Sequence, residues 1–416
     1  ASVPWVQVPD TRRALARLSA RFYGYPARRL RLIGVTGTNG KTTTTYLLKA
    51  IMQSAGSRVG LIGTIANWIG ERKLPVRHTT PESLDLQKLL AEMAAAGVDT
   101  VVMEVSSHAL ALHRVEGLPF ATAIFTNITQ DHLDFHKDMN DYLAAKKILF
   151  QMAEQFAVLN NDDPAAPELF RAARGRVVTY GIRQDADVKA ADIQLTTRGA
   201  SFRAQTPWGA ARVNLKLTGH FNVSNALAAL AAGGAHGLPL AAMVPALESV
   251  AGVPGRFELV DRGQDFTVVV DYAHTPDGLE NILKTARQLP HGRLITVFGC
   301  GGDRDRGKRP LMGEIAARFS DLVVVTSDNP RTEDPRRIIA EIEEGVQKVL
   351  RPEAYAVLPD RRQAIAYAVR TASRGDLVVI AGKGHEDYQI IGTVRFPFDD
   401  RIEAARAIEE RLAGKK

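Results

Sequence analysis

The chain has 416 residues, of which 45% are hydrophobic and 24% charged, and this predicts a globular protein of about two domains. Its one cysteine, Cys300, excludes an internal disulfide and suits a reducing cytoplasm, and no apolar run is long enough for a membrane span. The 53 basic and 46 acidic residues give a net charge of +7. Because the basic residues are scattered, small anionic substrates, or no special role, are favoured over nucleic acid.

The first part of the chain alternates expected strands and helices in the α/β manner. A short helix over residues 11–21 precedes a buried strand over 30–35, and a glycine-rich loop leads into an amphipathic helix over 41–54. Three strands, a small β-rich insertion and an alanine-rich helix are expected next, over 98–103, 120–128, 155–159, 177–217 and 222–233. Polar residues follow the strands, at the edge where open parallel sheets bind ligands.

A break at residues 252–255 precedes a second α/β series, with apolar strands expected over 266–270, 293–298, 321–325 and 376–380. The predicted fold class is therefore α/β. A P-loop domain with a mainly parallel sheet and the β-rich insertion is followed by a Rossmann-like C-terminal domain. We predict residues 27–252 as the central ATP-binding domain and 253–416 as the C-terminal domain, with 1–26 as a linker or the remnant of another domain.

Residues 37–43, Gly-Thr-Asn-Gly-Lys-Thr-Thr, have the composition of a phosphate-binding loop. Backbone N–H groups of such a loop point at a phosphate, and the following helix N-terminus adds a favourable potential. Lys41 is expected to meet the β- and γ-phosphate oxygens, and Thr42 to offer its hydroxyl to Mg²⁺. Val35 stands where the strict Walker pattern has a glycine, so the loop is a shortened variant. The alternative is a turn that only links strand to helix.

A magnesium ion near a phosphate needs only one or two carboxylates. Glu104, at a strand end in the same domain, is the leading candidate. His132 is a less typical ligand, and the same loop contains further candidates in Asp131, Asp134 and His136. The residues alone leave these alternatives open.

Further motifs follow the loop in order: Glu104-Val-Ser-Ser-His108, Asp131-His-Leu-Asp134, Gly219-His-Phe-Asn-Val-Ser-Asn-Ala226, Pro254-Gly-Arg-Phe-Glu258, Asp271-Tyr-Ala-His-Thr-Pro-Asp277, Gly299-Cys-Gly-Gly-Asp-Arg-Asp305, Asp328-Asn-Pro-Arg331 and Gly382-Lys-Gly-His-Glu386. With the loop they resemble the Mur ligase superfamily, and their spacing is similar to that of its diaminopimelate-adding members. The resemblance covers the chain from about Arg31 to the C-terminus and rests on the whole ordered set.

The resemblance implies an ATP-dependent acid–amino-acid ligase of cytoplasmic peptidoglycan precursor synthesis. Such an enzyme phosphorylates the D-glutamate γ-carboxylate of UDP-N-acetylmuramoyl-L-alanyl-D-glutamate, and the amino group of meso-2,6-diaminopimelate then displaces phosphate from the acyl phosphate. ATP is the co-substrate and Mg²⁺ the cofactor, and no nucleic acid is expected as a partner. The oligomeric state is left open. Phosphoryl transfer of this kind depends on positioning and charge neutralisation.

The resemblance also implies residue roles. Lys41, Lys146, His132 and Glu104 would be catalytic, and Mg²⁺ would be held by Thr42, Glu104, His132 and Lys146, the lysine as a carbamate. From the residues alone, Lys146 is a surface lysine of an amphipathic helix, and Asn222 and Asn225 are helix caps. The implied ATP-binding residues are Gly37, Thr38, Asn39, Gly40, Lys41, Thr42, Thr43, Asn222, Asn225, Arg256, Asp271 and His274. Those implied for the muropeptide are Thr79, Thr80, Ser106 and Arg114.

The amino-acid site implied by the resemblance consists of Arg304, Asp328, Asn329, Arg331, Gly382 and Glu386. Arg331 can grip a carboxylate through two parallel hydrogen bonds, and Glu386 suits an ammonium group. Lysine has no distal carboxylate for such an arginine. The alternative is a proline-punctuated turn whose aspartate caps the next helix.

Full-length relatives begin with a small domain that binds the uridine diphosphate, whereas only about 30 residues precede the first strand here, so we expect weaker muropeptide binding. The alternative functions are a lysine-adding or folylpolyglutamate synthase-like ligase, and a weakened or non-catalytic nucleotide-binding protein. The Asp328–Arg331 motif argues against the former. The joint presence of Lys41, Glu104, His132 and Lys146 argues against the latter.

Overall fold

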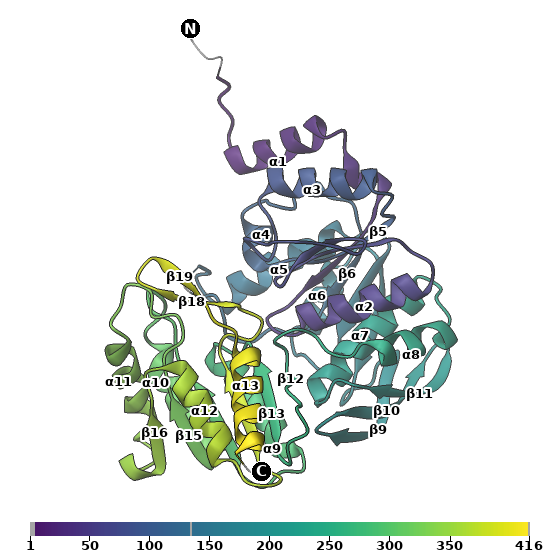
Figure 1. Ribbon diagram of the computed structural model, residues 1–416. Coiled ribbons are helices and arrows are strands. Elements are labelled where there is room, and N and C mark those ends of the chain that lie inside the picture. Colours follow the sequence, from purple (N-terminus) through teal and green to yellow (C-terminus); the bar gives the residue numbers. More distant parts are fainter. Residues whose placement is uncertain (1–4, 134, 415–416) are drawn as a thin grey trace. The chain divides into compact units, whose positions relative to one another are not determined.

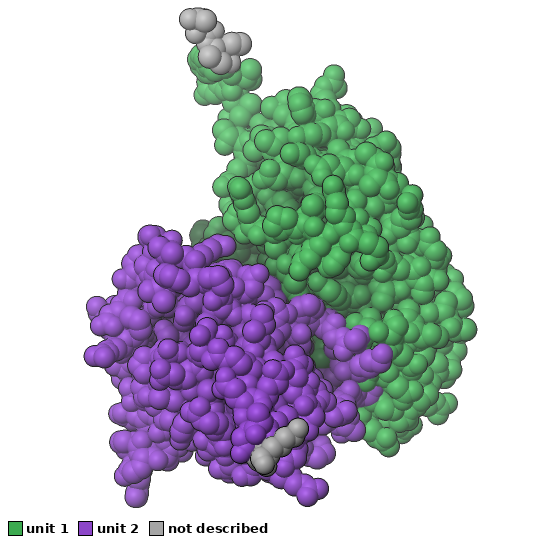
Figure 2. All heavy atoms as spheres, viewed as in Figure 1, with its two compact units in different colours: residues 1–194, 201–215, 221–250 green, residues 195–200, 216–220, 251–416 purple. Residues whose placement is uncertain are grey.

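The computed structural model describes residues 5–133 and 135–414, which form two compact units (Figures 1 and 2). The N-terminal unit contains residues up to 194 together with 201–215 and 221–250, and the C-terminal unit contains 195–200, 216–220 and 251 onward. Asp134, one of the candidate metal ligands, lies outside the described residues.

The first sheet consists of β1 (Arg31–Thr36), β2 (Val59–Ile62), β3 (Asn67–Ile69), β4 (Arg72–Leu74), β5 (Thr100–Glu104), β6 (Phe120–Phe125), β7 (Phe156–Asn160), β8 (Arg176–Gly181), β9 (Val188–Thr196), β10 (Gly199–Thr206) and β11 (Gly209–Leu215). The accompanying helices are α1 (Thr11–Phe22), η1 (Pro26–Arg29), α2 (Lys41–Ser54), α3 (Ser83–Ala95), α4 (Ser107–Ala111), α5 (Met139–Met152), α6 (Ala166–Ala172), α7 (His220–Ala235) and α8 (Leu240–Ser249).

Strand β1 lies inside an 11-stranded sheet of order β11-β10-β9-β8-β7-β6-β1-β5-β2-β3-β4. It pairs in parallel with β5 and β6, and Leu32, Ile33 and Val35 are fully buried, as expected for a strand covered on both faces. The segment expected as a β-rich insertion forms β8–β11 and continues this same sheet beyond β7. Parallel pairing brings the carboxyl ends of β1, β5 and β6 to one edge, which positions the phosphate-binding loop.

The C-terminal unit has a six-stranded sheet of order β12-β13-β17-β14-β15-β16, in which β12 is antiparallel to β13 and the other pairs are parallel. Its strands are β12 (Glu258–Leu259), β13 (Thr267–Asp271), β14 (Leu294–Phe298), β15 (Leu322–Val325), β16 (Tyr355–Val357) and β17 (Leu377–Ala381), with a separate hairpin of β18 (Tyr388–Ile391) and β19 (Val394–Pro397). The helices are α9 (Pro276–Gln288), α10 (Lys308–Phe319), α11 (Pro335–Val346), η2 (Pro352–Ala354), α12 (Arg361–Thr371) and α13 (Asp400–Ala413).

The predicted α/β fold class is confirmed, with a large, mainly parallel sheet followed by a second α/β sheet. Each sheet has its own buried apolar cluster. The short strands β2–β4, β12 and β16 and the β18–β19 hairpin were not predicted, because their apolar runs are too short to give a periodic signal. Within residues 5–133 and 135–414, no helix combines the length and apolar character that crossing a membrane requires.

Candidate functional site

The phosphate-binding loop joins β1 to α2, and its backbone conformation requires two glycines. Gly37 has φ +147° and Gly40 has φ +86°, a region that residues with a β-carbon rarely adopt. A β-carbon on Gly37 would overlap the Thr126 hydroxyl, and one on Gly40 would overlap the side-chain oxygen of Asn225. The loop is therefore packed tightly against the residue that follows β6 and against α7.

Two residues after β6 hold this loop by hydrogen bonds, and neither was predicted from the sequence. Asn127 Oδ1 accepts a hydrogen bond of 2.9 Å from Asn39 N, and Asn127 Nδ2 donates one of 3.2 Å to Asn39 O. Thr126 Oγ1 donates to the same carbonyl at 2.6 Å. Because β6 and β1 are parallel neighbours, the residues after both strands meet at one sheet edge. That rule could have indicated Thr126 and Asn127.

The Lys41 side chain folds back over the phosphate-binding loop. Its Nζ donates to Gly37 O at 2.8 Å and to Thr38 O at 2.7 Å. Thr42 and Thr43 are buried in the first turn of α2. An ammonium group and a helix N-terminus therefore coincide, and together they favour an anion at this position.

Lys146 on α5 is buried, with 1% of its surface exposed, so the surface position predicted from the helix pattern alone is wrong. Its Nζ lies 4.2 Å from the centroid of the Tyr142 ring, and Tyr142 Oη lies 3.1 Å from Thr38 Oγ1 in the loop. Burial, and then the positive charge of Lys41, lower the pKa of Lys146 well below its ordinary value, against an opposing effect of Asp131. The structure thus favours a neutral amine at this position.

His132 lies close to both lysines. Burial lowers the pKa of His132 to about 4, Asp131 opposes this, and Lys41 and Lys146 contribute to the lowering. The ring packs edge to face against His108, with centroids 4.8 Å apart. A neutral imidazole has a lone pair to offer, as metal ligation requires. His136 is instead buried with Nε2 2.9 Å from Ser107 Oγ.

Glu104 ends β5, and its register partner on β1 is Val35 in the strand before the loop. Its buried carboxylate accepts hydrogen bonds from Thr64 N at 2.9 Å and Thr64 Oγ1 at 3.0 Å. Across residues 5–133 and 135–414, no three His, Cys, Asp or Glu side chains are gathered as a metal ion would need. A metal held here therefore needs ligands of another kind besides Glu104 and His132.

The residues predicted for the muropeptide gather beside Glu104. Thr80 Oγ1 donates to Glu104 O at 2.9 Å and accepts a hydrogen bond from Ser106 N at 3.1 Å. Arg114 Nη1 donates to Thr80 O at 3.1 Å, and the hydroxyl of Thr79 lies 3.0 Å from that of Thr64. All four predicted residues thus belong to one polar network at the end of β5.

Asn222 and Asn225 lie inside α7, which begins at His220, so neither is the N-cap residue of that helix. Asn225 Nδ2 donates to Asn222 Oδ1 at 3.2 Å, and Asn225 Oδ1 accepts a hydrogen bond of 3.4 Å from Thr44 Oγ1 on α2. The pair therefore faces the helix that follows the phosphate-binding loop.

In the C-terminal unit, three predicted nucleotide residues meet around Tyr272. The Arg256 guanidinium lies 4.7 Å from the Tyr272 ring centroid, and the His274 ring lies 4.5 Å from it. Asp271, the last residue of β13, accepts hydrogen bonds from two backbone N–H groups. Burial raises the pKa of Asp271, with Arg256 opposing that shift.

The predicted amino-acid residues follow β14, β15 and β17. Arg331 has φ +50°, and its Nη1 donates to Gly302 O at 2.7 Å. A β-carbon on Gly301 would lie 2.9 Å from Arg331 Nη1 and 3.8 Å from Arg304 Cγ, so both arginines flank the same glycine. The Arg331 guanidinium therefore lies at the carboxyl edge of this sheet, with the aliphatic part of the exposed Arg304 side chain near the same glycine.

Glu386 lies at the same edge in a buried polar network. Its Oε2 accepts hydrogen bonds from Asn329 Nδ2 at 2.9 Å and from Lys383 Nζ at 3.0 Å. Asn329 Oδ1 in turn accepts from Lys383 Nζ at 3.2 Å and from Ile390 N at 2.9 Å. Asn329 thus holds Glu386 in place, and Lys383, which sequence reasoning did not single out, is fully buried between them.

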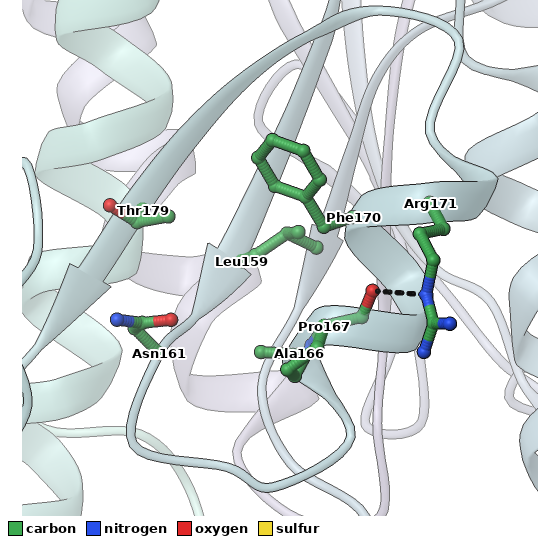
Figure 3. Close-up of a pocket in the computed structure, with 7 residues that line it drawn as sticks. All are labelled: Leu159, Asn161, Ala166, Pro167, Phe170, Arg171 and Thr179. Carbon is green, nitrogen blue, oxygen red and sulfur yellow. Dashed lines mark hydrogen bonds between the residues drawn. The ribbon is translucent and has the colours of Figure 1, made fainter.

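A separate hollow of about 420 Å³ lies on the N-terminal unit between α6, β7 and β8 (Figure 3). Its mostly apolar lining is Leu159, Asn161, Ala166, Pro167, Phe170, Arg171 and Thr179. Arg171 Nε donates to Pro167 O at 3.2 Å, as Figure 3 shows. None of the predicted site residues lines this hollow, so it is not the site described above.

Residues 35–233 match the Mur ligase middle domain, and residues 255–384 match the Mur ligase glutamate ligase domain. A UDP-N-acetylmuramoyl-L-alanyl-D-glutamate–2,6-diaminopimelate ligase of Syntrophomonas wolfei is 53% identical over 98% of this chain and 83% of its own length. A solved structure of a ligase of that name has a TM-score of 0.70 at 40% identity, over 98% of this chain and 84% of the other. Mycobacterium tuberculosis folylpolyglutamate synthase gives 0.72 at 21% identity, over 89% and 92%, which shows a common fold alone.

Proposed function

This chain belongs to the Mur ligase family, and we propose that it adds meso-2,6-diaminopimelate to the D-glutamate γ-carboxylate of UDP-N-acetylmuramoyl-L-alanyl-D-glutamate. The reaction uses ATP and belongs to cytoplasmic peptidoglycan precursor synthesis. In this proposal residues 27–252 are the central ATP-binding domain, and residues 253–416 bind the incoming amino acid and supply further contacts to the nucleotide.

The observation that carries the proposal is the charge pattern at the carboxyl edge of the C-terminal sheet. The Arg331 guanidinium and the aliphatic part of Arg304 lie beside Gly301, while Glu386 Oε2 accepts a hydrogen bond from Asn329 and forms an ion pair with Lys383. Guanidinium groups match carboxylates through paired hydrogen bonds, and a fixed carboxylate matches an ammonium group. An amino acid with an additional carboxylate, such as diaminopimelate, complements this arrangement better than lysine does.

For ATP, we propose that the phosphates lie on the loop 37–43 and that Lys41 leaves its two loop carbonyls to neutralise the β- and γ-phosphate oxygens. Asn222 and Asn225 would take the adenine side, and Arg256, Asp271 and His274 the ribose and phosphates. Such groups lower the barrier mainly by orienting the carboxylate for attack and by balancing negative charge. The carboxylate oxygen displaces ADP, and the substrate amine then displaces phosphate from the acyl carbon.

The available side chains fit Mg²⁺ if Lys146 is carbamylated. Thr42 offers a hydroxyl, Glu104 a carboxylate and His132 a neutral nitrogen, whereas a buried lysine ammonium would repel the metal. A neutral lysine amine reacts with CO₂ to give a carbamate and a proton, and the lowered pKa of Lys146 favours that neutral form. When bound, Mg²⁺ would supply positive charge at the phosphates, because it prefers oxygen ligands.

We propose the network of Thr79, Thr80, Ser106 and Arg114 as the muropeptide contact. Arg114 is the cationic member of this network, and its Nη2 lies 2.8 Å from Glu82 Oε1, so a peptide carboxylate that binds this guanidinium would replace Glu82 as its partner. Its bond to Thr80 O fixes its direction beside the Glu104 strand end.

The decisive experiment is ADP release in the presence of UDP-N-acetylmuramoyl-L-alanyl-D-glutamate, with diaminopimelate, lysine and glutamate supplied separately. We expect release with diaminopimelate. Release with lysine alone would identify a lysine-adding ligase, release with glutamate and a folate would identify a folylpolyglutamate synthase, and no release with any of them would identify a non-catalytic protein. A Lys41→Ala variant serves as the inactive reference.

A further inference from the structure

Arg361, the first residue of α12, is a buried cation outside the site residues considered so far. It is 1% exposed and is among the largest fully buried side chains of the described chain. Asp400, the first residue of α13, is its partner. Arg361 Nε donates to Asp400 Oδ1 at 2.8 Å and Nη2 donates to Oδ2 at 2.7 Å, and both side chains are fully buried. This is a bidentate pair, with the acidic partner fixed at a helix start.

The rest of the guanidinium group reaches two backbone carbonyls. Arg361 Nη1 donates to Ser327 O at 3.3 Å, and Nη2 donates to Ala381 O at 2.9 Å. Ser327 immediately precedes Asp328, and Ala381 immediately precedes Gly382. Each of these hydrogen bonds is therefore accepted by the carbonyl that precedes one of the two loops proposed to bind the amino acid.

Sheet pairing does not set the distance between these two loops. Strand β15, which leads to Asp328, and β17, which leads to Gly382, are not neighbours, because β14 lies between them. Both carbonyls also lie at or beyond the strand ends, where the regular ladder stops. A single planar guanidinium that bonds to both therefore joins the two loops at their bases. Further along, Asn329 bonds to Lys383 and Glu386, and these contacts join the same loops.

The two loops meet closely beside Arg361. Gly382 has φ +119°, and a β-carbon there would lie 2.6 Å from Asp328 Oδ2 and 3.8 Å from Arg361 Nη2. Because Gly382 has no β-carbon, the two loops can approach this closely, and a shift between them would change their spacing. Arg331 and Asn329 follow on one loop and Glu386 on the other, so the shift would also move the cationic and anionic groups apart.

We propose that Arg361 is a positioning residue, which sets the spacing of the two amino-acid-binding loops and thereby the fit of the substrate's charged ends. The identity of the substrate rests on the proposed function, whereas the geometry of the two loops does not. A purely structural role, in which the Arg361–Asp400 pair only stabilises the unit, is the competing explanation.

The test compares Arg361→Met with the double variant Arg361→Met/Asp400→Leu. Removing only the arginine leaves a buried carboxylate unpaired, so the single variant is expected to unfold at lower urea concentration. Replacing both charges by apolar groups is expected to restore most of that stability. The loop bonds to Ser327 and Ala381 stay broken in both variants. Because two hydrogen bonds are lost, we expect KM for diaminopimelate to rise at least about 10-fold in both variants. KM for ATP should stay within about twofold of its value in the unmodified chain.

Arg293→Met is the matched control, because Arg293 forms an ion pair with Asp376 at the opposite end of the same sheet, with Nη2 2.8 Å from Oδ2. It is expected to lower stability without raising KM for diaminopimelate. If that KM instead returns to normal in the double variant together with stability, the positioning role is wrong. Should Arg361→Met fail to fold, Arg361→Lys, which keeps the charge but lacks the planar fork, is expected to raise the same KM.

Amide hydrogen exchange separates this proposal from the proposed function, because it needs no turnover. We expect faster exchange over residues 327–331 and 381–386 in the double variant, and unchanged exchange in β14. If the unmodified chain releases no ADP with diaminopimelate, the proposed function fails while the exchange result still decides the positioning role. Unchanged exchange in both loops would overturn that role in either case.

Discussion

The side-chain amide of Asn127 pairs with the backbone of Asn39 in both directions, accepting from its N–H at 2.9 Å and donating to its carbonyl at 3.2 Å. Asn39 lies in the phosphate-binding loop, between Gly37 and Lys41. The residue that follows β6 therefore holds the loop in the shape that the proposed ATP site requires.

We predict that Asn127→Ala raises KM for ATP about 10-fold, because two hydrogen bonds of roughly 0.5–1.5 kcal/mol each are lost from the loop. Asn127→Asp is expected to be at least as harmful, since it removes the donor and adds negative charge near the phosphates. Steady-state kinetics with varied ATP measures the effect. KM for diaminopimelate is the internal control, and an unchanged KM for ATP in both variants contradicts the role.

The phosphate-binding loop was predictable because local chemistry specifies it. Gly37, Gly40 and Lys41 lie next to one another in the chain, after an apolar strand and before a helix, and each has a recognisable reason to be there. Asn127 was not predictable in the same way, since its partner is 88 residues away and depends on which strand lies beside β1.

Burial was the other property that the sequence could not supply. The helix around Lys146 reads as amphipathic, yet the side chain is 1% exposed because α5 turns it toward Tyr142 and the loop. Lys383 and Arg361 are likewise charged residues in polar contexts, and only the tertiary structure shows that both are fully enclosed. Strands β13, β14, β15 and β17 were predictable from their apolar runs, whereas β12, β16 and this charged network beneath the strand ends were not.

We predict that Arg331→Lys raises KM for diaminopimelate about 10- to 100-fold while KM for ATP stays within about twofold, because an ammonium group cannot reproduce a paired guanidinium–carboxylate contact. The main chain at this position is held independently, by Arg331 N to Ile390 O at 3.1 Å and Gly392 N to Arg331 O at 2.7 Å. Arg336→Lys, at an exposed position of α11, is the matched control. Equal KM values for the two variants would contradict the proposed contact.

We predict that Gly382→Ala strongly impairs diaminopimelate binding. A β-carbon there would lie 2.6 Å from Asp328 Oδ2, so the buried Asp328 side chain or the loop that carries it would have to move. Gly375→Ala is the control, since Gly375 also has positive φ, +81°, but nothing lies within 4 Å of its β-carbon position. Both variants carry the backbone cost of about 1 kcal/mol, and only Gly382→Ala carries the clash. Isothermal titration with diaminopimelate should therefore separate them, and similar affinities would show that the clash is relieved.

We predict that Lys146→Met lowers turnover at least about 100-fold, on the scale of losing a positioned charged group, and that added acetate or formate partly restores it by replacing the carbamate. Lys147→Met, the next residue on α5 and partner of Glu168 in an exposed ion pair, should retain activity. In the unmodified chain, ¹³C-bicarbonate should give a carbamate NMR signal that disappears in Lys146→Met. No signal, together with full activity in CO₂-free buffer, would exclude carbamylation.

His236, just after α7, should make the N-terminal unit less stable in mild acid. Its Nε2 lies 2.8 Å from the buried Thr122 Oγ1, and its ring packs edge to face on Phe156 with centroids 5.2 Å apart. Burial, and then the charge of Arg31, lower the pKa of His236 from 6.5 to about 4. The folded chain therefore keeps this ring neutral at a pH where the unfolded chain protonates it.

Proton uptake by the unfolded chain decides whether stability rises or falls with pH. Between pH 6.5 and about 4 the unfolded state binds one proton more at His236, so the free energy of unfolding falls with decreasing pH, by at most about 1.4 kcal/mol per unit. Above pH 6.5 this residue adds no pH dependence. His236→Gln keeps an acceptor for Thr122 but does not titrate, so its stability should fall less steeply between pH 6.5 and 5. Urea unfolding followed by tryptophan fluorescence measures the right unit, because Trp5, Trp68 and Trp208 all belong to it. Parallel pH profiles for the two chains would show that His236 is protonated equally in both states.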